Sequence, residues 1–140
     1  MKSGAAEDKL REIVAAQGGD PNAITDLSRL PRANHLRDVK SIRRGYVTAI
    51  DTEALGLAAM ALGAGRKFVS DRIDPAVGFV LEKKLGDAVD VGEPLLIIHS
   101  NSASMIDDVT ARVVRAFEVG ETPPPARPLI VERMISAEII

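Results

Sequence analysis

The sequence predicts an α+β fold: a small, barrel-like sandwich of short, mostly antiparallel strands with one buried and one flanking helix. Two short apolar runs, residues 77–81 and 95–98, contain the β-branched side chains typical of strands. Turn signals at 86–87 and 92–94 separate these runs, because glycine supplies the positive φ of a tight turn and proline suits a strand start. Residues 71–99 are therefore predicted to form the series of strands and turns on which the rest of the chain packs.

Composition limits the classes of function that the chain can serve. A hydrophobic content of 46% over 140 residues is enough for a core, but an aromatic content of 3% without tryptophan leaves few platforms for stacking bases or sugars. The net charge of −2, with basic residues spread along the chain, disfavours nucleic-acid binding. The absence of cysteine excludes disulfides and thiolate metal sites. The longest apolar run, 54–65, is shorter than the roughly 20 residues of a membrane span, and no signal peptide is recognisable, so the expected location is cytoplasmic.

A helix is predicted at the start of the chain. Ser3 is the expected N-cap, glycines 18–19 end the helix, and four apolar residues share one face: Ala6, Leu10, Ile13 and Val14. A narrow apolar stripe on a lone helix in residues 1–20 indicates a piece of a longer protein, and residues 21–35 are predicted to be an extended connection. We expect the apolar face of this helix to be exposed when the chain is alone, or covered by another copy.

Two strands and a short helix are expected next. Gly45 divides the segment 37–50 into two predicted strands, and Asp51 or Thr52 can cap the helix that follows. Apolar residues of this helix recur at helical spacing, at Leu55, Ala58, Ala59 and Leu62. Because almost no polar face remains, the helix is predicted to be buried against a sheet and to end at Gly63 and Gly65.

A third helix is predicted after the polar loop 100–104, with Ser104 as its N-cap and Asp107 at the capping-box position. It is expected to run to Gly120 with five buried residues: Ile106, Val109, Val113, Ala116 and Phe117.

The C-terminal residues carry weaker signals. Residues 122–125 are predicted to form a stiff, polyproline-like linker, 129–135 an edge strand, and 136–140 a frayed tail.

From the residues and their spacing we predict no catalytic, cofactor-binding or metal-ligating residue in this sequence. Glycines at 63–66 follow a helix instead of preceding one, so a cap is favoured over a phosphate site. His35 and His99 lack a third metal ligand at recognisable spacing. The pairs Asp71 with Asp74 and Asp87 with Asp90 are close enough in sequence to suggest acid/base chemistry. Turn formation explains the presence of these aspartates better.

The pattern G-D-x-V-x-x-G-E-P-L at 86–95 resembles the barrel-sandwich module of biotinyl and lipoyl carrier domains. This resemblance implies a lysine that carries the cofactor at the tip following the next strand. Residues 100–105 contain no lysine there, whereas Lys83 and Lys84 precede the pattern and are expected to be solvated. An unmodified scaffold of this type, acting as an interaction module, remains the alternative function.

Several runs in the same order resemble the C-terminal domain of thymidine phosphorylase and the pyrimidine-nucleoside phosphorylases. They are residues 51–66, 70–79, 85–90 and 94–99, and residues 16–20 resemble the segment before that domain. The resemblance implies that residues 36–135 form this domain, a small barrel-sandwich of the α/β-hammerhead-like type. It also implies that the helix in residues 1–20 belongs to the α/β domain that precedes it.

The same resemblance implies the function of a longer parent enzyme. The family performs reversible phosphorolysis of thymidine, deoxyuridine or uridine, in a cleft between a helical domain and an α/β domain, and the parent is expected to be a homodimer. The family's phosphate-binding and pyrimidine-binding motifs lie upstream and match no position here. The resemblance therefore assigns no catalytic residue and no cofactor to this chain, and it predicts that the chain alone is inactive, with the missing domains as its partners.

Overall fold

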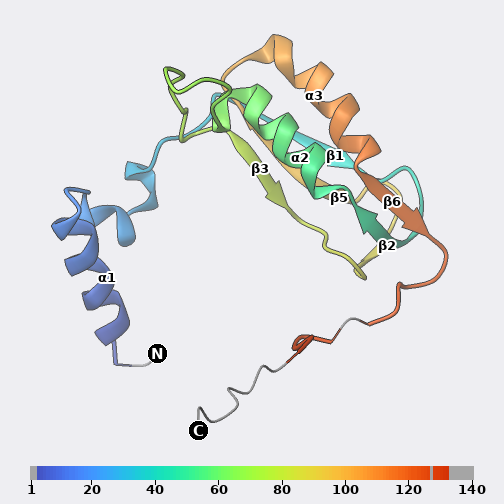
Figure 1. The fold of residues 1–140 in the computed structure, drawn as a ribbon, viewed down its shortest axis with the longest axis horizontal. Coiled ribbons are helices and arrows are strands. Elements are labelled where there is room, and N and C mark those ends of the chain that lie inside the picture. Colours follow the sequence, from blue (N-terminus) through green and yellow to red (C-terminus); the bar gives the residue numbers. More distant parts are fainter. Residues whose placement is uncertain (1–2, 127, 133–140) are drawn as a thin grey trace, which may run out of the picture.

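A computed structural model describes residues 3–126 and 128–132 of the chain. It has the predicted α+β architecture: two small antiparallel sheets with helices α2 and α3 packed beside them (Figure 1). A separate helical segment at the N-terminus lies to one side of the sheets (Figure 1).

The first sheet has the strand order β1–β5–β3. Strand β5 (Pro94–Ser100) lies between β1 (His35–Lys40) and β3 (Gly78–Leu81), and both neighbours run antiparallel to it. Four residues of β5 are buried because it is the central strand, and Pro94 stands at its first position, where a missing N–H costs least. The apolar runs at 77–81 and 95–98 therefore form neighbouring strands, as predicted.

The second sheet has the order β4–β2–β6. Strand β2 (Gly45–Ile50) pairs with the two-residue β4 (Ala88–Val89) on one side and with β6 (Phe117–Gly120) on the other. The predicted division of 37–50 at Gly45 is confirmed, but its two strands join different sheets. The turn at 41–44 thus carries the chain from one sheet to the other.

Helix α2 (Thr52–Ala59) begins where Asp51 accepts a hydrogen bond from the Ala54 N–H at 2.9 Å, as predicted from its sequence position. It continues into the π-helical turn η3 (Met60–Ala64), which ends where Gly63 adopts a φ of 106°. The expectation that the helix is buried against a sheet is confirmed at Leu55 and Ala58, which lie in the core, but not over the whole helix, since Leu57 is 54% exposed. Only one face meets the sheets and α3, because no second layer covers the outer face.

Helix α3 (Ala103–Arg115) differs from its prediction at both ends. Its N-cap is Ser102, not Ser104, and no side chain caps it by a hydrogen bond. It ends at Arg115, and residues up to Gly120 form β6 instead of helix. Strand β2 presents an unpaired edge there, and pairing with it satisfies the backbone groups of a segment that contains β-branched Val119.

One hydrophobic core joins the two sheets and the two helices. Apolar side chains less than 2% exposed come from both sheets and from both helices: Val39, Val47, Ala58, Leu96, Ile98, Val109 and Val113. The predicted apolar face of α3 is confirmed at Ile106, Val109, Val113 and Ala116, all of which are buried. Phe117 is buried as well, but as the first residue of β6.

The N-terminal segment comprises α1 (Ala5–Ala16) and two 3-10 helices, η1 (Pro21–Ile24) and η2 (Leu27–Arg29). The N-cap of α1 is Gly4, not Ser3, and the helix end is followed by Gly18 with a φ of 78°. The connection predicted to be extended contains η1 and η2, because Asp20 and Asp26 accept backbone N–H groups and start these turns.

Residues 121–126 and 128–132 contain no helix or strand. The described part of the predicted edge strand, 129–132, is therefore not a strand. Its remainder and the predicted frayed tail lie outside the described residues.

Candidate functional site

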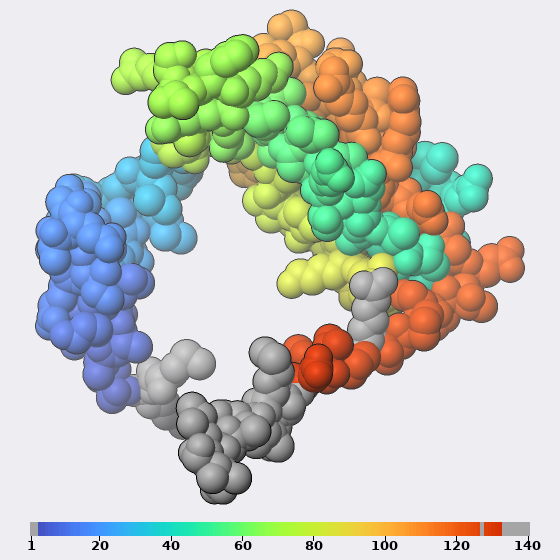
Figure 2. Space-filling view, in the orientation of Figure 1, coloured from blue at the N-terminus to red at the C-terminus, as the bar shows by residue number. Residues whose placement is uncertain are grey.

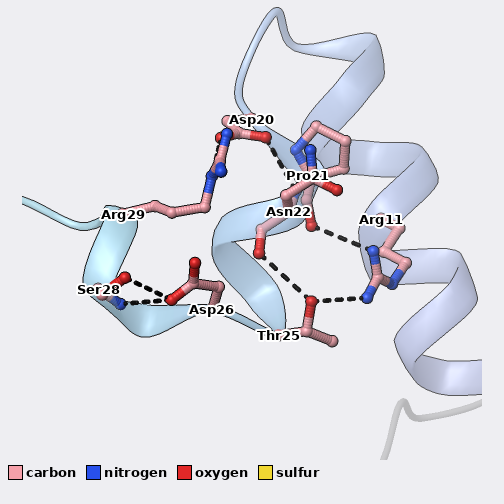
Figure 3. Close-up of polar contacts among 8 residues, drawn as sticks. All are labelled: Arg11, Asp20, Pro21, Asn22, Thr25, Asp26, Ser28 and Arg29. Carbon is pink, nitrogen blue, oxygen red and sulfur yellow. Dashed lines mark hydrogen bonds and ion pairs between the residues drawn. The ribbon is translucent and has the colours of Figure 1, made fainter.

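A polar network holds the three N-terminal helices together (Figure 3). The Arg11 guanidinium on α1 donates to Thr25 Oγ1 at 3.0 Å and to the Pro21 carbonyl at 3.4 Å, which joins α1 to η1. Arg29 Nε pairs with Asp20 Oδ2 at 2.6 Å, which joins η2 to the start of η1. These contacts span residues up to 14 positions apart, so they fix the path of the whole segment and not of one turn alone.

An apolar groove of about 550 Å³ lies beside this network. Six apolar side chains line it: Leu10, Val14, Ala23, Ile24, Leu27 and Leu30. Leu27 is 64% exposed and Leu30 48% exposed, and no residue of 3–32 is buried. In Figure 2 the segment stands apart from the sheets with open space between them. The expectation that the apolar face of α1 is exposed in the chain alone is confirmed at Leu10.

The pKa of Asp20 is lowered from its ordinary value of 3.8, first by the hydrogen bond from Arg29 and then by the Asn22 N–H. The carboxylate therefore stays ionised beside the groove, and its charge is matched by Arg29. Asp20 and Arg29 make the rim of the groove polar, but their charges cancel. A rim of this kind suits an uncharged, apolar partner.

A second, polar pocket lies between β2, β4 and the turn before β5. Its charged residues include Arg44, Lys83, Asp90 and Glu93. Arg44 Nε lies 3.1 Å from Asp90 Oδ1 and Lys83 Nζ 2.9 Å from Glu93 Oε2, so these charges occur as matched pairs. The pKa of Glu93 is lowered, chiefly by the Asp90 N–H and then by Lys83. Glu121 also lines the pocket, and because Arg44 and Lys83 are both paired, the pocket offers no unpaired cation to an anionic ligand.

Asn101 connects the domain to the segment that enters it. Its Oδ1 accepts the Asn34 N–H at 2.8 Å and its Nδ2 donates to Asp74 Oδ2 at 2.7 Å. The pKa of Asp74 is lowered, first by the Ala76 N–H and then by Asn101. This network fixes the point at which the N-terminal segment joins the start of β1.

Because folding lowers the pKa of Asp74, its carboxylate stabilises the fold fully above its ordinary value of 3.8, and this contribution disappears as the pH falls through the lower folded value. We expect the wild-type chain to keep a constant urea midpoint from pH 7 to 5 and to lose stability below about pH 4. Asp74→Asn should lower the midpoint at pH 7 and flatten the fall below pH 4. An identical acid limb in the variant and the wild type would contradict this assignment.

The aspartate pairs singled out in the sequence form turns. Asp71 accepts the N–H groups of Lys67 and Phe68, and Asp87 accepts that of Lys84 at 2.7 Å. Asp74 and Asp90 make the contacts already described. The interpretation as turn residues is confirmed for Asp71, Asp74 and Asp87, whose carboxylates accept backbone N–H groups, but not for Asp90, whose carboxylate pairs with Arg44.

The two histidines lie on adjacent strands but point to opposite faces. His99 on β5 is paired with Leu36 of β1, whereas His35 is paired with Ser100. Successive strand residues alternate between faces, so the imidazoles cannot share a ligand on one face. Among residues 3–126 and 128–132, no three His, Asp or Glu side chains gather in a way that suits a metal ion.

The glycine-rich stretch 63–66 ends a helix, as predicted. The Gly63 carbonyl accepts the Asp74 N–H at 2.9 Å and so ties this stretch to the loop that follows it. An anion site would instead need backbone N–H donors at the start of a helix.

The position at which carrier domains hold their lysine is occupied by a tight turn into α3. Ser100 is 1% exposed and its Oγ donates to the Ser102 carbonyl at 3.0 Å. No hairpin tip projects at 100–105, since β5 leads directly into a helix. Lys83 makes an ion pair with Glu93 instead of extending into solvent alone.

The Arg11 network and the apolar groove were not predicted from the sequence. The signal was the spacing of Ile24, Leu27 and Leu30, three residues apart, which places side chains on one side of successive 3-10 turns. Two nearby prolines, Pro21 and Pro31, favoured an extended interpretation instead. No helix in the part of the chain that the structure describes has the length and apolar character of a membrane span.

The sequence model described as the pyrimidine nucleoside phosphorylase C-terminal domain matches residues 46–120, from β2 to the end of β6. A pyrimidine-nucleoside phosphorylase of Geobacillus stearothermophilus is 42% identical over 134 residues, which are 96% of this chain and 31% of the relative. One of Staphylococcus aureus is 42% identical over 121 residues, 86% of this chain and 28% of the relative. The chain spans about a third of the length of these relatives.

Proposed function

Because this chain belongs to the pyrimidine nucleoside phosphorylase C-terminal domain family, we propose that it is the C-terminal part of a pyrimidine-nucleoside phosphorylase. In this proposal the whole enzyme performs reversible phosphorolysis of a pyrimidine nucleoside, giving the free base and a pentose 1-phosphate. The main support for this proposal is the match of residues 46–120 to the family's C-terminal domain. The chain is also 42% identical to a relative about three times its length.

The chain alone is proposed to be inactive. Phosphorolysis requires a site that neutralises a phosphate dianion with backbone N–H groups and a cation. In the described residues the polar pocket at β2 and β4 has its cations Arg44 and Lys83 paired with carboxylates, and 63–66 presents a helix end. These observations support a reaction centre built by the preceding part of the enzyme, with phosphate and nucleoside bound there.

The domain is proposed to buttress the preceding phosphate-binding domain and to help set the closure of the substrate cleft. In this arrangement residues 5–30 belong structurally with that preceding domain. Their lack of any buried residue supports this division, because a segment without a core of its own needs another surface to pack on.

The proposal is tested with a chimera of the Geobacillus stearothermophilus phosphorylase in which the matching C-terminal third is replaced by this chain. Phosphorolysis of thymidine and uridine is followed by release of free base. We expect turnover within about tenfold of the parent enzyme for the chimera and none for the isolated chain. A folded chimera without turnover, or turnover by the isolated chain, would contradict the proposal.

The second candidate function is an unmodified carrier-like scaffold that acts as an interaction module. The pattern at 86–95 favours it, because it forms strand β4, the turn at Gly92 and the start of β5. The chimera separates the two candidates, because a scaffold that only mediates interactions would not restore phosphorolysis. An intact mass measurement of the purified chain tests for a modified carrier: the unmodified mass is expected, and an added biotinyl or lipoyl mass would contradict both candidates.

A further inference from the structure

The N-terminal segment and its connection to β1, residues 3–34, are attached to the rest of the fold at a polar junction formed by Asn101. Asn101 lies in the turn between β5 and α3, where the connection from η2 reaches the sheets (Figure 1). Between residues 3–34 and the later residues that the structure describes there is one hydrogen bond, from the Asn34 N–H to Asn101 Oδ1 at 2.8 Å. No residue of 3–32 is buried, so side-chain packing does little to hold this segment in place. The direction in which the segment leaves the domain therefore depends on Asn101.

Both polar atoms of the Asn101 amide are used. Oδ1 accepts the Asn34 N–H, and Nδ2 donates to Asp74 Oδ2 at 2.7 Å. A backbone N–H can only donate and an ionised carboxylate can only accept, so the two partners fix which way the amide points. A side chain held from two sides in this way can in turn hold the backbone at Asn34.

The carboxylate that orients Asn101 is itself held. Asp74 Oδ1 accepts the Ala76 N–H at 2.9 Å, and the Asp74 N–H donates to the Gly63 carbonyl at the end of η3, also at 2.9 Å. The same hydrogen bonds, first that of Ala76 and then that of Asn101, lower the pKa of Asp74 from 3.8, so the carboxylate is ionised at neutral pH. The junction is thus braced against the loop before β3, 27 positions from Asn101 in the chain.

We propose that Asn101 is a positioning residue for the phosphorolysis proposed above: it fixes the angle at which the N-terminal segment leaves the domain, and thereby the position of the domain beside the substrate cleft of the longer enzyme. The part of this inference that concerns phosphorolysis rests on the proposed function. A rotation at Asn34 would displace the whole domain relative to the polypeptide before it. Misplacement by about 1 Å far from the reacting atoms can lower an enzymatic rate by about a hundredfold.

The angle is measured first, in the chain as it is. The sequence contains no cysteine, so Ala16→Cys on α1 and Ala111→Cys on α3, both at exposed positions, allow two nitroxide labels to be attached selectively. Pulsed electron paramagnetic resonance then gives the distribution of distances between the labels. We expect a narrow distribution with Asn101 present and one at least about twice as wide when the junction is broken, because hinge motion becomes free.

Asn101→Asp breaks the junction, and exchange of the two side chains repairs it. Asn101→Asp alone sets two carboxylates against each other and removes the donor, whereas Asp74→Asn alone leaves one oxygen for two donors. In the double variant the amide at position 74 donates to the carboxylate at 101 and still accepts the Ala76 N–H. The carboxylate at 101 still accepts the Asn34 N–H. The double variant should therefore restore the narrow distribution, a non-additive result that independent structural roles of the two residues would not produce.

The effect on phosphorolysis is measured in the chimera with the preceding part of the Geobacillus stearothermophilus enzyme. Asn101→Asp should lower kcat/KM by about tenfold, with kcat and KM both changed, as for other hinge positions. The exchange of side chains should recover kcat/KM to within about twofold of the unmodified chimera. Ala103→Asp is the matched control, because it adds the same charge at an exposed position in the first turn of α3, where an acidic residue is tolerated. It should change neither the label distances nor the kinetics.

The outcomes separate the junction from the proposed function. Unchanged label distances in Asn101→Asp, even with a lower urea midpoint, would show that Asn101 only stabilises its own turn, and the proposal would be overturned. A broken junction in an active chimera whose kinetics do not change would overturn the positioning role. If the unmodified chimera has no turnover, the proposed function fails, and the label distances still decide whether Asn101 fixes the angle.

Discussion

Leu96→Ala is expected to lower the free energy of unfolding by about 3 kcal/mol, within the range of roughly 2–5 kcal/mol for buried leucine-to-alanine changes. Leu96 is 0% exposed and lies in β5, where it pairs with Val39 of β1 and Leu81 of β3. Truncation leaves a cavity that neighbours on both sides of a central strand cannot close. A small domain has only about 5–15 kcal/mol in total, so this is a large share.

Urea unfolding of the whole chain, followed by far-UV circular dichroism, measures this loss as a lower midpoint. Leu36→Ala is the matched control in the same sheet, because Leu36 is 63% exposed on β1. It should change stability by no more than about 0.5 kcal/mol. Similar losses for the two variants would show that β5 does not form the centre of the core.

The sequence predicted those parts of the fold whose signals are local. The apolar runs at 77–81 and 95–98 became β3 and β5, and Asp51 became a helix cap, because strand burial and capping depend on a few adjacent residues. Strand β6 was missed because Phe117 and Val119 continue the apolar pattern of α3. Its strand conformation is decided by the edge of β2, which lies some 70 residues earlier in the chain.

The candidate site was predictable only in part for the same reason. Three of the four turn aspartates were predicted correctly, since Asp71, Asp74 and Asp87 accept backbone N–H groups close to them in sequence. The groove requires Leu10 on α1 to meet Leu27 and Leu30 after two glycines and a proline reverse the chain. Neither helical nor strand periodicity describes a surface assembled from one helix and two 3-10 turns.

The family could be predicted from the sequence because the assignment uses several short motifs together. Each turn or helix run is common in unrelated proteins, but their order between 51 and 99 is specific. The family match at 46–120 contains all of them, and it also includes β6, the element that local patterns did not identify.

Gly45→Ala is expected to destabilise the chain by about 2–4 kcal/mol through backbone strain and a steric clash. Gly45 begins β2 with a φ of 156°, a conformation that side chains disfavour. A Cβ there would lie 2.2 Å from the Gly120 carbonyl oxygen, far inside contact distance. Since that oxygen belongs to the backbone of β6, the clash cannot be relieved by moving a side chain.

The same substitution at Gly56 separates strain from the general effect of adding a methyl group. Gly56 is exposed on the outer face of helix α2, and no neighbouring side chain or strand lies within 4 Å of the added Cβ, so Gly56→Ala should stabilise the chain by about 0.5–1 kcal/mol. Opposite shifts in the urea midpoint are therefore expected, with faster amide exchange at 117–120 in Gly45→Ala only. Stabilisation by both variants would mean that β2 and β6 do not approach this closely, and the pairing of Tyr46 with Gly120 that closes the second sheet would have to be abandoned.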